Sequence, residues 1–89
     1  MVKITFTENL ARHVKLTTLE LQDGTIAEVI EQLFGQYPML KPYIFDEQNK
    51  LRKHVMLAID KQLLQGDLSS HLKMTGFKRL HIMQALSGG

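Results

Sequence analysis

The stretch TIAEVIEQLFGQYP, residues 25–38, decides the fold. Its apolar residues recur three or four positions apart: Ile26, Val29, Ile30, Leu33, Phe34 and Tyr37. This spacing places them on one face of an α-helix. Thr25 and Glu28 form the capping-box pattern that begins a helix, and Pro38 ends it because proline has no backbone amide to donate. The segment predicts one amphipathic helix whose apolar face must pack against another element.

Two runs that alternate apolar and polar residues precede this helix. Residues 2–7 alternate with Ile4 and Phe6 on the apolar side, and residues 14–21 repeat the pattern. Residues 8–13 between them are short enough for a hairpin loop. We therefore expect two strands, each with one buried face.

Three shorter apolar runs follow the helix. Residues 54–59 have little polarity on either face, which predicts a central strand. Residues 63–64 predict a short edge strand, and residues 78–84 predict the last strand. Residues 39–45 are apolar but contain a proline, and they are compatible with a short turn of helix.

The expected order is strand, strand, helix, strand, short strand, strand. One helix that crosses a mixed sheet of four or five strands is the β-grasp, or ubiquitin-like, arrangement of the α+β class. A ferredoxin-like RNA-binding domain needs a second amphipathic helix, and residues 60–83 show no more than one turn of helical periodicity. We expect a single β-grasp domain over residues 1–84 and a flexible tail over residues 85–89.

The composition excludes several kinds of chemistry. The chain has 89 residues, no cysteine and a formal net charge of +2, from 11 Lys and Arg against 9 Asp and Glu. Without cysteine it forms no disulfide scaffold, zinc–thiolate site or cysteine nucleophile. No apolar run approaches the roughly 20 residues that span a bilayer, and the N-terminus lacks the pattern of a secretory signal. We expect a cytoplasmic protein with no membrane partner.

No catalytic constellation is apparent in the sequence. It has no glycine-rich phosphate loop and no nucleophile elbow. His54 and His81 come together only if their strands pair in a suitable register, and two ligands are fewer than metal sites use. Residues 75–78 are similar to the aromatic motif of RNA-binding sheets, with Phe77 as the one aromatic. We expect no catalytic side chains, bound metal or nucleic-acid partner, and keep RNA binding as an alternative.

The sequence ends ALSGG, residues 85–89. Glycine has no Cβ, so Gly88 and Gly89 can enter a narrow channel and leave a terminal carboxylate sterically open. Five extended residues reach roughly 17 Å, which is enough to enter the active site of another protein. A frayed end without function is the alternative.

The whole chain resembles the ubiquitin-like sulfur carriers, which include the small subunit of molybdopterin synthase and the sulfur carrier of thiamine biosynthesis. The segments that carry the resemblance are residues 24–30, 37–38, 44–47, 51–55 and 85–89.

The resemblance implies a specific chemistry. An E1-like adenylating enzyme would use ATP and magnesium to activate Gly89, with Gly88 as its slender neighbour. A persulfide sulfurtransferase would convert the adenylate into a thiocarboxylate, and an acceptor synthase, that of molybdopterin foremost, would take the sulfur. The carrier itself would bind no cofactor, and its partners would catalyse the steps. The alternatives are a ubiquitin-like modifier joined through Gly89 to target proteins, and a β-grasp interaction module with an idle tail.

We expect partners to contact the uncovered face of the sheet and the tail. The candidate residues are Met56, Ala58, His81 and Met83 on the central strands, Leu86 in the tail, and the basic Arg52, Lys53 and Arg79. Methionines and small apolar side chains make adaptable contact surfaces, and basic side chains speed the encounter with an acidic partner. Solvated charge is the alternative for the basic residues.

Overall fold

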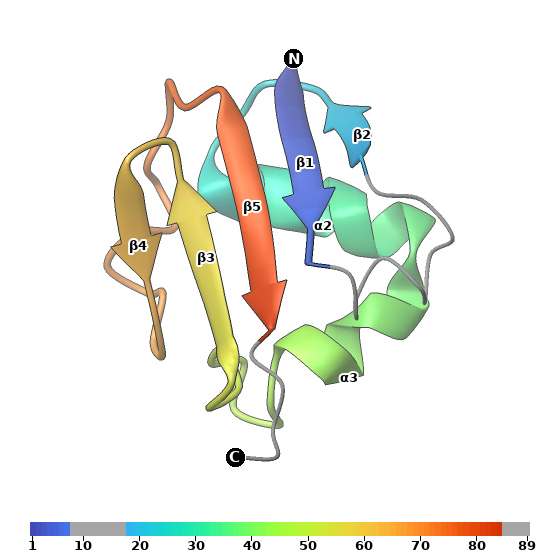
Figure 1. Cartoon of the computed structure of the whole chain (residues 1–89), viewed down its shortest axis with the longest axis vertical. Helices are drawn as coiled ribbons and strands as arrows, with labels where there is room; N and C mark the ends of the chain where they lie inside the picture. The colour runs from blue at the N-terminus through green and yellow to red at the C-terminus, as the bar shows by residue number, and fades with distance from the viewer. Residues whose placement is uncertain (8–17, 85–89) are drawn as a thin grey trace.

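The computed structural model describes residues 1–7 and 18–84, and these residues form one sheet with helices on one side (Figure 1). The strands are β1 (Val2–Phe6), β2 (Thr18–Leu21), β3 (Val55–Ile59), β4 (Gln62–Leu64) and β5 (Arg79–Gln84). The helices are α2 (Ile26–Gln36), the 3₁₀ helix η1 (Pro38–Leu40) and α3 (Lys41–Ile44). The expected hairpin loop, the first half of the second strand and the tail (8–17 and 85–89) lie outside the described residues.

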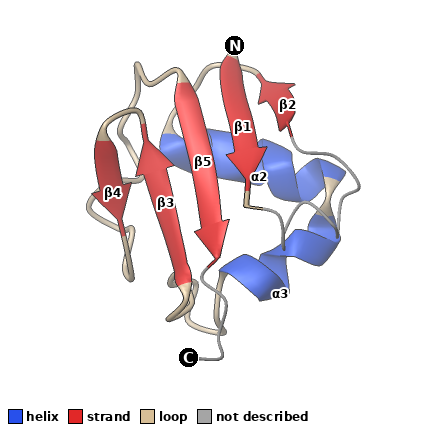
Figure 2. Ribbon diagram, in the orientation of Figure 1, coloured by secondary structure: helices blue, strands red, loops and turns tan. Residues whose placement is uncertain are grey.

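The last strand of the chain occupies the centre of the sheet. The strand order is β2-β1-β5-β3-β4, with β5 parallel to β1 and antiparallel to β3. The pairs β1–β2 and β3–β4 are antiparallel. Figure 2 shows α2 lying across one face of this sheet, and none of the described helices covers the other face. The mixed five-stranded sheet with one main helix confirms the predicted fold class.

The core lies between the sheet and α2. Alternate residues of β1, β3 and β5 are buried, as the sequence predicted, because successive side chains of a strand point to opposite faces. The main buried residues of these elements are Val2, Ile4, Phe6, Ile26, Val29, Leu33, Val55, Leu57, Ile59, Leu80 and Ile82. The other half of the helical stripe, Ile30, Phe34 and Tyr37, is only half-buried. The apolar face of α2 is therefore wider than the sheet it covers.

The start of α2 has the predicted capping box. The Thr25 hydroxyl accepts a hydrogen bond from the Glu28 amide (3.2 Å), and the Thr25 amide donates to the Glu28 carboxylate (2.9 Å). That backbone hydrogen bond is the main cause that holds the pKa of Glu28 below its ordinary value. These contacts satisfy amides that a helix leaves without intrahelical partners.

The segment from β4 to β5 satisfies the remaining first-turn amides of the helix. The Ile26 amide donates to the Met74 carbonyl (3.0 Å), and the Ala27 amide donates to the Leu72 carbonyl (3.1 Å). Phe77, at the end of this segment, is 4% exposed and belongs to the core. Its ring is therefore unavailable for stacking on a base, which removes the residue on which the RNA-binding alternative rested.

The region after α2 resolves what the sequence left ambiguous. Two short helices, η1 and α3, follow directly, and Pro42 lies in the first turn of α3. A proline is tolerated there because first-turn amides have no intrahelical acceptor. The Arg52 side chain donates to the Pro42 carbonyl (2.6 Å) and ties α3 to the strand side of the fold.

Asp60 builds the tight turn from β3 to β4 and also holds the start of β5. Its φ of 51° is in the left-handed region, which aspartate and asparagine tolerate better than most residues. Its carboxylate accepts hydrogen bonds from the backbone amides of Lys78 (3.1 Å) and Arg79 (2.9 Å). One side chain thus connects the end of β3 to the beginning of its neighbour.

Two glycine substitutions should change stability in opposite directions. Gly35 has no positive φ and nothing within 4 Å of a built Cβ, so Gly35→Ala should raise the free energy of unfolding by about 0.5–1 kcal/mol. Gly76 has equal space but a φ of 87°, so Gly76→Ala should lower that free energy by about 1 kcal/mol. Urea denaturation measures both values. A loss of stability in Gly35→Ala would contradict the description of α2.

Substitutions of Asp60 should separate its two contributions. Asp60→Asn keeps an oxygen acceptor and tolerance of positive φ, so it should remain close to the parent in stability. Asp60→Ala loses both, and its free energy of unfolding should fall by about 2 kcal/mol. Asp60→Gly relieves the backbone only and should lie between them. Equal stability of the alanine and asparagine variants would show that the carboxylate does not hold β5.

Candidate functional site

The uncovered face of the sheet, called the open face below, brings together the candidate residues of the central strands. Met56 of β3 is paired with Met83 of β5, and Ala58 is paired with His81. His81 is also paired with Thr5 of β1. All five side chains are half-buried, although no helix within residues 1–7 and 18–84 covers them. The structure therefore places Met56, Ala58, His81 and Met83 on one continuous surface.

The two methionines lie at the end of the open face where β5 finishes. They line a hollow of about 500 Å³ together with Thr7, Lys53, His54, Gln65 and Gln84. The Gln84 amide donates to the Thr7 hydroxyl (3.1 Å), which fixes the end of β5 beside β1. Gln84 is the last described residue before the tail, so the hollow lies where the tail leaves the sheet.

His81 has a defined orientation at the centre of the open face. Its Nδ1 is 2.5 Å from the Thr5 hydroxyl, and which of the two atoms donates depends on the imidazole tautomer. His81 is paired with Ala58, and His54 lies four residues before Ala58, just outside the paired residues of β3. Among the described residues, no group of three or more His, Asp or Glu side chains is arranged to hold a metal ion.

The basic candidates do not form one patch. Lys53 lines the hollow with the methionines. Arg52, its neighbour in sequence, has its side chain bonded to the carbonyl of Pro42 and so supports α3. Arg79 lies at the opposite end of β5. Leu86, Gly88 and Gly89 lie outside the described residues.

Sequence reasoning missed the contribution of β1 to the open face. Lys3, Thr5 and Thr7 occupy the positions between its buried residues, and Thr5 and Thr7 are half-buried beside β5. The alternation of residues 2–7 already carried this signal. What it did not reveal was that β1 would lie next to the last strand.

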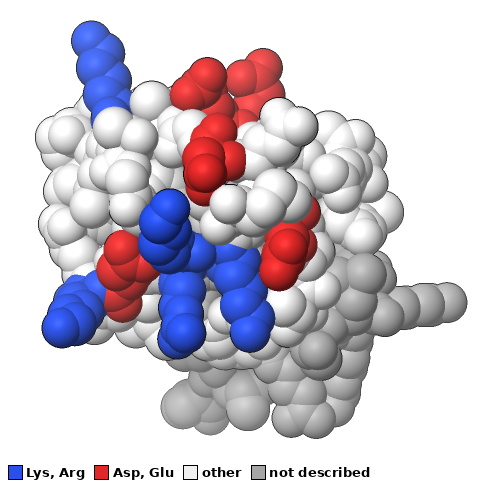
Figure 3. All heavy atoms as spheres, turned by 90° about the horizontal axis from the view of Figure 1, so that it is seen from above, with Lys and Arg blue, Asp and Glu red and all other residues white. Residues whose placement is uncertain are grey.

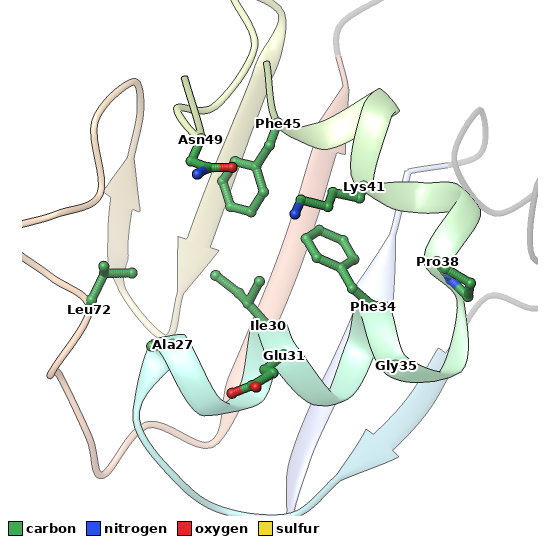
Figure 4. Close-up of a pocket in the computed structure, with 10 residues that line it drawn as sticks. All are labelled: Ala27, Ile30, Glu31, Phe34, Gly35, Pro38, Lys41, Phe45, Asn49 and Leu72. Atoms are coloured by element: carbon green, nitrogen blue, oxygen red, sulfur yellow. The ribbon is translucent and has the colours of Figure 1, made fainter. Parts of the chain in front are cut away.

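A second hollow lies on the helical side, between α2 and α3. It measures about 640 Å³, and the rings of Phe34 and Phe45 meet there edge to face, with centroids 5.6 Å apart. Figure 4 shows Lys41 extending toward these two rings and Glu31 at the opposite margin. Its floor is the half of the α2 stripe that the sheet leaves uncovered.

No helix in the described part of the chain is long and apolar enough to cross a membrane.

Comparison with known proteins identifies the fold. No protein-family model and no curated protein matches the sequence. Solved structures do match. SAMP1 from Haloferax volcanii has a TM-score of 0.77 and 19% identity, with coverage of 99% of this chain and 98% of that one. A chain of the BexX/CysO complex from Amycolatopsis orientalis has a TM-score of 0.76 and 19% identity, with full coverage of both chains.

A third structure agrees with these two. The small archaeal modifier protein 1 from Methanosarcina acetivorans has a TM-score of 0.72 and 23% identity, over 99% of this chain and 95% of that one. Identities this low show a common fold and leave the activity to be argued from the site. With strand order, helix position and full-length likeness in agreement, the chain has the ubiquitin-like β-grasp fold of these small proteins.

Proposed function

We propose that this chain is a ubiquitin-like sulfur carrier whose Gly89 is converted to a thiocarboxylate. The observation that carries the proposal is the position of the last strand. β5 is the central strand of a β-grasp sheet, and the glycines follow it by only three residues. A tail that begins there is anchored to the most strongly paired strand of the fold.

The chemistry would take place on the terminal carboxylate. An E1-like enzyme with ATP and magnesium would join a Gly89 oxygen to the α-phosphorus of ATP, with pyrophosphate as the leaving group. The terminal sulfur of a persulfide donor would then attack the carbonyl carbon and displace AMP, which leaves an acyl disulfide. A second thiol of the donor protein would cleave its S–S bond, so that the thiocarboxylate is released and a disulfide forms on the donor. Gly88 and Gly89 present no side chain that would obstruct these steps. The absence of cysteine is compatible with this chemistry because the reactive sulfur is carried at the end of the backbone.

The open face supplies the contact surface in this proposal. Met56 and Met83 offer adaptable apolar contacts beside the origin of the tail, and Lys53 adds a cation to the same hollow. A partner that binds there is positioned to receive the tail. The same surface would serve first the adenylating enzyme and then an acceptor synthase, for which a molybdopterin-synthase subunit is our first candidate.

A ubiquitin-like modifier is the second candidate function. Three of the similar structures are of small archaeal modifier protein 1, or SAMP1, and this name supports the modifier as the second candidate. A modifier would use the same adenylate but would pass Gly89 to a lysine amine instead of accepting sulfur. The two functions therefore separate only after activation.

Mass spectrometry of the C-terminal peptide tests the proposal. After incubation with the adenylating enzyme, MgATP and a persulfide donor, the peptide should gain the mass difference between sulfur and oxygen. Deletion of Gly88 and Gly89 should abolish the gain and leave the fold unchanged by circular dichroism. Gly35→Ala, a glycine substitution in α2, should retain it. An unmodified carboxylate on Gly89 would contradict the proposal, and Gly-Gly remnants on target lysines would favour the modifier.

A charge placed in the hollow lined by Met56 and Met83, called the methionine hollow below, should weaken partner binding. Met83→Glu puts a carboxylate where an apolar contact is expected, so the KM of the adenylating enzyme for the carrier should rise about tenfold or more, the equivalent of about 1.4 kcal/mol, with a smaller change in kcat. Met39→Glu is the matched control, because Met39 is 48% exposed in η1 on the helical side. Equal effects of the two substitutions would show that the open face is not the contact surface.

A further inference from the structure

Four basic residues from three separate parts of the sequence meet at one end of the open face. β1 and β5 begin at this end, and β3 finishes there, because β5 is parallel to β1 and antiparallel to β3. Lys3, Lys61, Lys78 and Arg79 are consequently close together, and all four are exposed. We call these four residues the cationic end. Figure 3, which looks onto this end, shows Lys and Arg side chains gathered on it with acidic side chains on either side.

The acidic neighbours do not neutralise these cations by contact. Asp60 uses its carboxylate to accept hydrogen bonds from the backbone amides of Lys78 and Arg79. The one ion pair found among the described residues joins the amino group of Met1 to Asp23 (3.1 Å). The fold therefore leaves the charged groups of the cationic end available to another molecule.

Lys3 and Arg79 form the least favourable part of this arrangement. They are direct partners in the parallel pairing of β1 and β5. Like charges that lie opposite each other on a sheet destabilise it. A bound anion between the two side chains would remove this repulsion.

A recess beside the pair provides suitable hydrogen-bonding groups. It measures about 230 Å³ and is lined by Lys3, Arg79, Thr5, His81, Ala58 and Asp60. The Asp60 carboxylate in this lining already accepts hydrogen bonds from the Lys78 and Arg79 amides. The Thr5 hydroxyl and the His81 imidazole are held together at its inner side by their hydrogen bond. A carboxylate that enters would meet two cations, Lys3 and Arg79, against the single anion Asp60. The cations, with the Thr5 hydroxyl and the His81 imidazole beside them, offer charge-assisted hydrogen bonds.

We propose that the cationic end binds a carboxylate-bearing surface of the partner protein. This proposal rests on the proposed function: the partner that binds the methionine hollow would also contact the far end of the same open face. Arg79 and Met83 are four positions apart on β5, so the partner would present acidic groups roughly 13 Å from its apolar contact. Nucleic acid fits less well, because the binding of a single strand relies on aromatic rings on which successive bases stack. Apart from the imidazoles of His54 and His81, the described residues of the open face carry no aromatic ring.

An NMR titration tests the proposal without any activating enzyme. Hexaglutamate peptide, used as the probe at low ionic strength, should shift the amide resonances of Lys3, Arg79 and His81. Lys3→Gln/Arg79→Gln should weaken binding at least tenfold. The matched control Lys41→Gln/Lys50→Gln removes two charges elsewhere on the chain and should bind as the parent does. Absence of localised shifts, or equal weakening by the control, would overturn the proposal.

Two further measurements separate this proposal from its rivals. A single-stranded RNA oligonucleotide should bind more weakly than hexaglutamate, and tighter RNA binding would overturn the assignment to a protein partner. With the adenylating enzyme, Lys3→Glu/Arg79→Glu should raise KM about tenfold and leave kcat at saturating carrier nearly unchanged, and an unchanged KM would count against the proposal. Hexaglutamate binding without thiocarboxylate formation would instead refute the proposed function alone.

Discussion

The pairing of β5 between β1 and β3 is the constraint on which the rest of the structure depends. Leu80 and Ile82 point into the core from this strand, while Arg79, His81 and Met83 point the other way. A shift of one residue in the register would exchange these two sets, because side chains alternate along a strand. The core and the open face are therefore specified by the same pairing.

The two faces of the sheet differ because the described helices cover only one of them. α2 is held over the core face by its capping box and by amides that donate to the segment before β5. The open face has Thr5, Ala58 and His81 at its centre, the two methionines with Lys53 at one end, and the cationic end at the other. Exposed apolar groups bordered by polar ones are typical of surfaces that bind other proteins.

Much of the fold follows from local sequence patterns. The period of the apolar residues in α2, its capping residues and the alternation of β1, β3 and β5 are all local, and they led to the correct elements. The outward positions of Met56, Ala58, His81 and Met83 followed from the same alternation. The short helices after Pro38 were harder to predict, because Pro42 indicates a break yet is tolerated in a first turn.

Other features depend on contacts between distant parts of the chain. Arg52 and Lys53 are adjacent and equally basic, but only the tertiary structure shows that one is bonded to Pro42 and the other lines the methionine hollow. The cationic end likewise requires the strand order, because Lys3 and Lys78 come from opposite ends of the sequence. Phe77 is buried in the core, and a single aromatic residue in a loop gives no local pattern from which its burial could be predicted.

The central claim is that the open face delivers a terminal glycine for activation. Exchange of labelled pyrophosphate into ATP by the adenylating enzyme tests it most directly, because this exchange requires a reversible adenylate on the carrier. The account predicts rapid exchange with the intact chain and none after removal of Gly88 and Gly89. Exchange that persists without these two residues, or that the intact chain fails to support, would contradict it.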